Sequence, residues 1–382
     1  MDVMQVLAAH GGALGGGKYR KGGKIPATNL IPPIVPTLVS DFALYVQTSS
    51  TLSMSYDPFE DLIIATHYSS TSQSRILRCK PNDMKAINSV YISSDNSGNN
   101  PSNKLSHCNV YANGKYYTTF SVYPTSQSSI RVHDAATGSL IKTINGTGID
   151  LILQRTADYV IYFCSYHKKI HKLNFADDSV NVITDLNSYS NPSALVVHGW
   201  DKFIIKDNGK SYLYNYDGTY SGTVINNQNI IQPAFYHPPS NTIICMRYKY
   251  ATTGGHFMEK YDPTNFALIS SKKLTDRNQV SSSGWGPNCY YDVGSKAVLV
   301  TMTDYNTPIT YLFPIADDGI TIVGWDYAQL PGTNLGKYGG VKSGSFEVVT
   351  RDGIASRIYV DPGSTDYTHE VLHMRTNFLI GG

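Results

Sequence analysis

The feature that most constrains this chain is a motif that returns along most of its length: two short apolar runs joined by a polar turn. Its clearest copy covers residues 129–144, SIRVHDAATGSLIKTI, in which Ile130 and Val132 alternate with polar residues before the turn. Alternation on both sides of a turn rich in Asp, Thr and Gly predicts two antiparallel strands. Such turns recur at steps of about 47 residues, near Pro81, Asp134, Asp177, Asp217, Asp262, Ala316 and Asp361.

A second series of turns adds two further strands to each unit. These turns lie near Pro58, Gly114, Asp158, Asp201, Ser240, Gly294 and Gly344. A unit of four short strands buries its faces only against its neighbours, and a closed ring leaves no unit uncovered. We therefore predict an all-β fold, a seven-bladed β-propeller of four-stranded antiparallel blades with an extended N-terminal arm. The predicted propeller spans residues 41–382, with blades at approximately 52–92, 105–145, 150–186, 193–225, 231–274, 286–330 and 337–376.

One turn also resembles a known repeat. Residues 132–144 read VHDAATGSLIKTI, and the Asp-x-x-Thr-Gly at 134–138 resembles the turn of YVTN-type and quinoprotein-like propeller repeats. Part of this pattern returns at residues 262–265, Asp-Pro-Thr-Asn, whereas the other turns keep only an Asp or a Gly. The resemblance implies a propeller fold and implies no enzymatic role.

Residues 1–40 differ in composition from the rest of the chain and are predicted to form an arm. A short amphipathic stretch is followed by the Gly-rich residues 11–17, a basic segment and a segment interrupted by prolines. An arm of this kind becomes ordered only by lying against another surface. Residues 41–47 either close the ring against residues 369–374 or belong to the arm. The predicted assembly contacts are Val3, Leu7, Lys18, Tyr19, Arg20 and Lys21.

The composition argues against several classes of function. Charged residues make up 16% of the chain, against the roughly 25% typical of soluble domains, so Ser, Thr, Asn and Tyr are expected to cover the surface. A formal net charge of +2 supplies no field that would attract nucleic acid. No apolar run is long enough to span a membrane, and the N-terminus lacks the features of a signal peptide. We therefore expect synthesis in a host cytoplasm, no nucleic-acid partner and no membrane insertion.

No pattern in the sequence predicts a catalytic residue, a cofactor or a metal ion. Gly12, Gly17 and Lys18 imitate a phosphate-binding loop, but Tyr19 replaces the Ser or Thr that would hold magnesium. The five cysteines contain no Cys-x-x-Cys pair and are interpreted as buried, reduced thiols.

Two further groups of polar residues have a structural interpretation. The carboxylate pairs at 177–178 and 317–318 fall at the same turn of their units, where Asp caps the backbone. His167 and His171 lie among lysines and are interpreted as part of a solvated hairpin rather than a metal site. Seven tyrosines at strands or strand ends either form an exposed binding surface or fill the space between blades: Tyr116, Tyr117, Tyr123, Tyr248, Tyr250, Tyr290 and Tyr291.

Three functions are consistent with these observations. The low charge, the missing export signal and the arm predict a structural or attachment component of a virus particle, such as a bacteriophage tail, baseplate or head appendage, located in the virion. In that hypothesis the arm binds other virion proteins in a homo- or hetero-oligomeric assembly, and the loops contact a host-surface protein or glycan. The first alternative is a propeller-class glycan lyase or hydrolase, with Arg155 and Asp57 near the innermost strands. The second is an intracellular interaction scaffold of the WD-repeat kind, of which residues 198–201, His-Gly-Trp-Asp, carry one altered signature.

Overall fold

The computed structural model describes residues 52–57, 59–68, 73–80, 86–93, 109–122, 127–231, 234–249, 255–275, 288–292, 297–304, 307–321, 328–329, 347–349, 353–360 and 368–375. The predicted arm lies outside these ranges, with Val3, Leu7, Lys18, Tyr19, Arg20, Lys21 and the loop at 12–18. Residues 41–47 also lie outside them.

Within the described residues the strands form sheets in which each strand pairs with the next along the chain. The first sheet contains β1 (Leu52–Asp57), β2 (Leu62–Tyr68), β3 (Gln73–Cys79) and β4 (Ala86–Ser93). The second contains β5 (Val110–Ala112), β6 (Lys115–Val122), β7 (Gln127–Asp134) and β8 (Leu140–Asn145). The third contains β9 (Leu151–Arg155), β10 (Tyr159–Cys164), β11 (Lys169–Asn174) and β12 (Val180–Asp185).

The remaining sheets follow the same order. The fourth contains β13 (Ser193–Val196), β14 (Lys202–Asp207), β15 (Lys210–Asn215) and β16 (Tyr220–Ile225). The fifth contains β17 (Ala234–His237), β18 (Thr242–Lys249), β19 (Gly255–Tyr261) and β20 (Leu268–Thr275). The sixth contains β21 (Asn288–Asp292), β22 (Ala297–Asp304), β23 (Thr307–Pro314) and β24 (Ala328–Gln329). The last contains β25 (Glu347–Val349), β26 (Gly353–Val360) and β27 (Thr368–Arg375).

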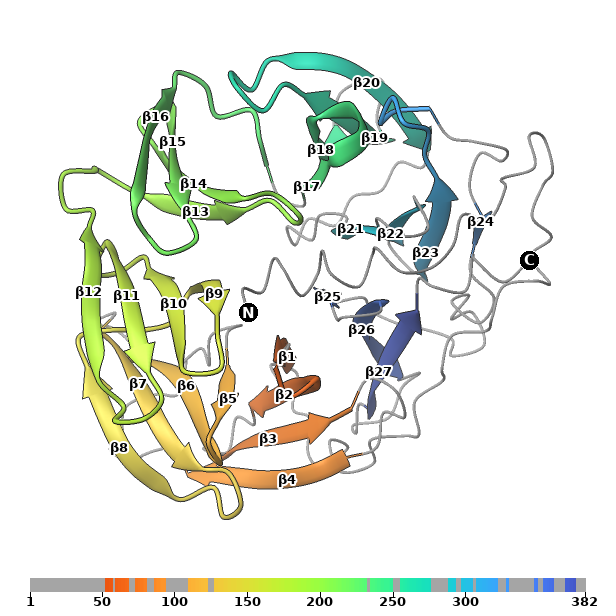
Figure 1. The fold of residues 1–382 in the computed structure, drawn as a ribbon. Coiled ribbons are helices and arrows are strands. Elements are labelled where there is room, and N and C mark those ends of the chain that lie inside the picture. The colour runs from red at the N-terminus through yellow and green to blue at the C-terminus, as the bar shows by residue number, and fades with distance from the viewer. Residues whose placement is uncertain are drawn as a thin grey trace.

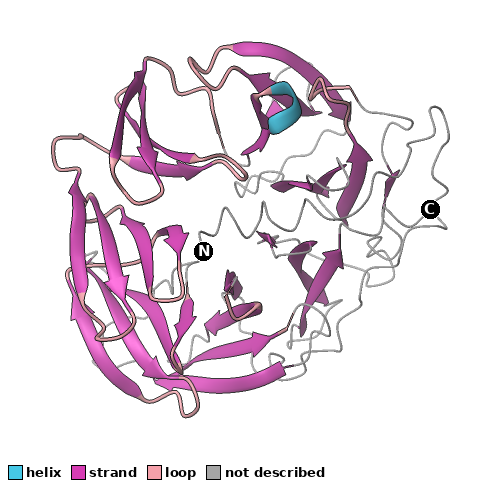
Figure 2. Ribbon diagram, viewed as in Figure 1, coloured by secondary structure: helices cyan, strands magenta, loops and turns pink. Residues whose placement is uncertain are grey.

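The sheets stand side by side around a common centre, and in the first five the first strand lies nearest to it (Figure 1). Strand β1 contacts both β5 and β25, so the first sheet lies between the second and the last. Among the described residues the helical structure is one short 3-10 helix, Pro238–Ser240 (Figure 2), and no helix there is long and apolar enough to cross a membrane. The prediction of an all-β fold built from four-stranded antiparallel sheets is confirmed, whereas the last sheet has three described strands.

The predicted hairpin at residues 129–144 is present and shows how these turns form. Strands β7 and β8 pair antiparallel, and Asp134 Oδ1 accepts the backbone N–H groups of Ala136 (3.0 Å) and Thr137 (2.8 Å). The hydrogen bonds from the backbone and hydroxyl of Thr137 hold the pKa of Asp134 below its usual value. The side chains of Asp177, Asp217, Asp262 and Asp318 cap their turns in the same way. The turn-capping prediction is therefore confirmed for Asp177 and Asp318.

A residue with positive φ follows each of these caps and docks on the preceding sheet. We call this contact a seam and the residue its seam residue. The seam residues, with their φ angles, are Gly138 (78°), Asp178 (57°), Gly218 (88°), Phe266 (57°) and Gly319 (75°). Their contacts are with Tyr91 for Gly138, Lys115 and Tyr117 for Asp178, Ile170 and Ile183 for Gly218, Trp200 for Phe266, and His237 and Ser240 for Gly319.

A side-chain donor from the preceding sheet also reaches a backbone carbonyl in each of these turns. The donors and acceptors are Asn88 to Ala135 (2.7 Å), Lys142 to Asp178 (3.3 Å), Thr184 to Gly218 (2.7 Å), Asn227 to Phe266 (2.8 Å) and Lys260 to Asp318. Turn carbonyls that face a neighbouring sheet would otherwise lose hydration without a partner. The same turn of each unit thus caps its own hairpin and joins two sheets.

The core lies between neighbouring sheets. One cluster of buried side chains combines residues of the first and second sheets, another the second and third, and two more the next pairs along the chain. Tyr116, Tyr117 and Tyr162 are fully buried in these clusters. Tyrosine therefore supplies bulk to the core, and the expectation that it covers the surface is wrong for these residues. Cys79, Cys164 and Cys245 are buried free thiols, as predicted.

Candidate functional site at the ends of the innermost strands

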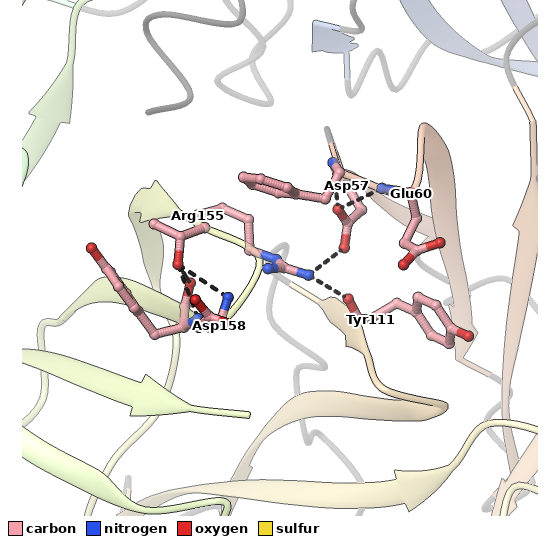
Figure 3. A network of polar contacts seen from close by, with 8 residues as sticks. Asp57, Glu60, Tyr111, Arg155 and Asp158 are labelled. Carbon is pink, nitrogen blue, oxygen red and sulfur yellow. Dashed lines mark hydrogen bonds and ion pairs between the residues drawn. The ribbon is translucent and has the colours of Figure 1, made fainter. Parts of the chain in front are cut away.

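The innermost strands of the first three sheets bring together two residues that the sequence singled out. Asp57 ends β1 and Arg155 ends β9, while Tyr111 lies on β5 between them (Figure 3). Asp57 and Arg155 are 98 positions apart in the chain, yet Arg155 Nη2 lies 2.9 Å from Asp57 Oδ2. The first strands thus bring together a carboxylate and an arginine, the convergence of charged side chains that the enzyme alternative requires.

The geometry of this pair leaves little of it accessible. The side chains of Arg155 and Asp57 are only 6% and 2% exposed. The same Nη2 also donates to the carbonyl oxygen of Tyr111 at 2.9 Å. The guanidinium lies over the rings of Phe175 (4.3 Å) and Phe59 (5.1 Å), a stacking that is favourable for a desolvated cation. One arginine therefore joins three sheets.

The second oxygen of Asp57 is occupied as well. Asp57 Oδ1 accepts the backbone N–H groups of Phe59 (2.9 Å) and Glu60 (3.3 Å), which shapes the turn into β2. Burial lowers the pKa of Arg155, and the charge and hydrogen bond of Asp57 oppose that effect. Among the described residues, Arg155 Nε and Nη1 have no hydrogen-bond partner. Both carboxylate oxygens of Asp57 thus have partners, and the buried charge of Arg155 is balanced by Asp57. The pair is a structural connection between the first and third sheets.

A second network connects the second and third sheets, and the sequence did not predict it. Asp178 accepts a hydrogen bond from the Tyr117 hydroxyl (2.7 Å) and pairs with Lys115 Nζ (2.9 Å). Burial, then the hydrogen bond to Asp178, raises the pKa of Tyr117. Asp178 was predicted to cap its own turn, but the positive φ of this residue turns its side chain toward the second sheet. The prediction is wrong for Asp178.

The third network lies within the fifth sheet. Glu259, which is 2% exposed, pairs with Arg247 Nε at 2.9 Å and accepts the Tyr261 hydroxyl at 2.5 Å. Arg247 also donates to the backbone oxygen of Asn229, in the segment that leads to β17. The charges of this network, on Glu259 and Arg247, therefore pair with each other as they do in the first two networks.

One of the two histidines of the third sheet differs from its predicted environment. His171 is 4% exposed and its ring stacks on Tyr162 at 5.3 Å, so the solvated-hairpin interpretation is wrong for this residue. His167 is half-buried, with its ring edge against exposed Tyr166. The described residues contain no group of three His, Cys, Asp or Glu side chains that could hold a metal ion. The tyrosines at 123, 248, 250, 290 and 291 have side chains outside the described part of the chain.

Comparison with known proteins gives likeness in structure only. No family model matches the chain, and no curated protein matches it. Hsv2 of Kluyveromyces lactis is 10% identical with a TM-score of 0.44, and the match covers 85% of this chain and 98% of that chain. The β-propeller domain of Cps50 (Swd1) from Myceliophteria thermophila is 8% identical with a TM-score of 0.45, over 86% and 98% of the two chains. A eukaryotic initiation factor is 12% identical with a TM-score of 0.35, over 72% and 64%.

Hsv2 and Swd1 are WD40-type β-propellers, and the four-stranded antiparallel sheets of this chain are consistent with a propeller. The comparisons do not support the predicted virus-particle component or its location in a virion, and that prediction is withdrawn: the similar structures named above are eukaryotic proteins. One physical premise of that prediction also changes, because Tyr116, Tyr117 and Tyr162 lie in the core rather than on the surface.

Proposed function

We propose that this chain is an interaction scaffold, a closed ring of seven blades that binds another protein through its outer surface. The paired charges of the first three sheets support this assignment, because Asp57 with Arg155 and Asp178 with Lys115 hold sheets together. Side chains committed to such ties are not available to act on a substrate. The observation that carries the proposal is the exposure of apolar side chains on the outermost strands.

These exposed side chains recur from sheet to sheet. Strands β4, β8, β12, β16 and β20 carry Ile87, Tyr91, Leu140, Ile141, Val182, Tyr220, Val224, Leu268 and Ile269, each between 43% and 53% exposed. Adjacent Leu268 and Ile269 are 50% and 53% exposed. Exposed apolar side chains that recur on the outermost strands of successive sheets make this edge the candidate interaction surface.

The partner is expected to contact side chains rather than to add a strand. The pairing of each of these outermost strands with its neighbour contains a register shift. Bulges twist an edge and interrupt its hydrogen-bond pattern, which protects it against pairing with another strand. A partner with an apolar surface of its own fits such an edge.

The proposed surface predicts that replacing Leu268 and Ile269 with Ser abolishes partner binding without loss of stability. The experiment compares proteins captured by the full chain, by L268S/I269S and by the control N181S, which changes an exposed polar residue on β12. A partner retained by the wild type and N181S but lost from L268S/I269S is expected. Capture of the same proteins by all three chains, or of none by the wild type, would contradict the proposal.

The closed ring requires a fourth strand in the last sheet, and we assign it to residues 41–47. Strand β25 contacts β1, as β5 does, so it takes the innermost position and β27 is the third strand. The apolar residues of DFALYVQ suit a strand added to β27, and this segment lies shortly before β1 in the chain. Deletion of residues 1–47 is expected to lower the melting temperature, whereas deletion of residues 1–40 is expected to leave it unchanged. Equal melting temperatures for the two deletions would refute the assignment.

A further inference from the structure

Two buried histidines lie beside the seams that flank the second sheet. His133 on β7 is 0% exposed and lies opposite Tyr116, which packs in the cluster shared with the first sheet. His171 on β11 is 4% exposed and stacks on Tyr162 in the cluster shared by the second and third sheets. Neither histidine takes part in the networks described above.

His133 is held next to a seam residue. Its Nδ1 lies 3.2 Å from the carbonyl oxygen of Gly138, the glycine that abuts the Tyr91 backbone of β4. Nδ1 of a neutral imidazole can donate to this carbonyl, but Nε2 has no partner among the described residues. A proton added at Nε2 would therefore place an unpaired donor and a positive charge between two sheets.

The charged groups around His133 make that proton more costly. Arg131 lies two residues earlier on β7, and Arg78 from the first sheet extends over the Tyr116 ring at 5.4 Å. The carboxylate of Asp134 is turned into its own hairpin, where it accepts backbone N–H groups. The neighbour on β8 is apolar Leu140. A protonated His133 would thus add a cation beside Arg131, whose charge opposes protonation of the imidazole.

His171 has an even less favourable position for charge. Neither ring nitrogen has a hydrogen-bond partner among the described residues. The residue opposite His171 on β12 is Val182. The Tyr162 hydroxyl forms a hydrogen bond with the Thr147 hydroxyl at 2.5 Å rather than with the imidazole. The nearby titratable groups, Lys169 and His167, both oppose protonation.

We propose that protonation of His133 and His171 opens the two seams around the second sheet, so that the ring loosens there in mildly acidic solution. This protonation changes how tightly the sheets are held together, and the proposal does not depend on the proposed partner surface. Each of these two charges would arise between two sheets rather than within one.

The direction of the pH dependence follows from the burial of the two rings. Burial lowers the pKa of His133 and of His171 from 6.5 to about 4. The neutral form is therefore favoured in the closed state, so the stabilisation is complete above pH 6.5 and is lost as the pH falls toward 4. For shifts of this size, the open population at pH 5 rises about 30-fold for each histidine.

The test measures amide hydrogen exchange by mass spectrometry at pH 7.5 and pH 5, corrected for the intrinsic exchange rate. In the wild type, β4, β7, β10 and β11 are expected to lose protection by about 30-fold, while β14 and β15 keep theirs. H133Q retains an amide donor for the Gly138 carbonyl, and H171F retains a ring against Tyr162. The double variant H133Q/H171F is expected to show no acid-induced loss, whereas the control H167Q behaves like the wild type.

Three results would overturn the proposal: equal loss of protection in H133Q/H171F and the wild type, uniform loss over all sheets, or no loss in the wild type. Should the double variant fail to fold, NMR titration of the histidine Cε1 protons in the wild type decides the matter. Midpoints below pH 5 for His133 and His171 are expected. Midpoints near 6.5 would refute a closed state that excludes the proton.

Discussion

Substitution of Gly138 with Ala is expected to destabilise the protein by about 2–5 kcal/mol, combining the strain of a left-handed residue with overpacking. Gly138 has a φ of 78°, and a Cβ atom there would collide with the backbone carbonyl of Tyr91 in the first sheet. That carbonyl belongs to β4, so either sheet must move as a body to relieve the collision. Urea-induced unfolding of G138A and the wild type measures the effect.

Gly209 supplies the matched control. It has a φ of 77° in the Asn208-Gly209 hairpin, but a Cβ there would meet nothing within 4 Å. G209A therefore reports the conformational strain alone, about 1–2 kcal/mol, and the difference between the variants is the contribution of the seam. An equal loss for G138A and G209A would show that the close approach to Tyr91 has no role in stability.

Removal of either member of the Asp57–Arg155 pair is expected to cost about 3–5 kcal/mol, because the remaining charge stays buried without its partner. Both side chains are almost inaccessible, and Arg155 also holds the Tyr111 carbonyl. The double variant D57A/R155M should lose much less than the sum of D57A and R155M, because it leaves no uncompensated charge. The measurement is the free energy of unfolding of four proteins: the wild type, D57A, R155M and D57A/R155M.

The exposed pair Asp201–Lys202 is the control for this cycle. Its atoms are also 2.9 Å apart, but its side chains are 71% and 29% exposed. Solvent screens such a pair, so its coupling should be about 0–1 kcal/mol. Additive losses at Asp57 and Arg155 would mean that the pair does not tie the sheets. Variants that remain stable but lose a measurable turnover would favour the enzyme alternative.

The hairpins were predictable from the sequence because their signal is local. Asp134, Thr137 and Gly138 lie in one turn, and the carboxylate of Asp134 caps the backbone that immediately follows it. The alternation of Ile130 and Val132 with polar residues likewise predicted the strand, although Arg131 and His133 on its other face are buried as well. Local chemistry thus predicts the all-β fold and its four-stranded antiparallel sheets.

The contacts between sheets were not predictable in this way. Asp177 and Asp178 are chemically identical, and only the positive φ of Asp178 directs it to Lys115 and Tyr117 rather than to its own turn. The sequence placed Arg155 and Asp57 near the innermost strands, but their pairing depends on how three sheets stand around the centre (Figure 1). Long-range packing decides both outcomes.

Amide hydrogen exchange of G138A against the wild type at neutral pH tests most directly whether seams hold the sheets to one another. Protection should fall in β3, β4, β7 and β8, which meet at the altered seam, while the third and fourth sheets remain as in the wild type. A uniform change over all the sheets, or no change at the first two, would contradict a ring held together sheet by sheet.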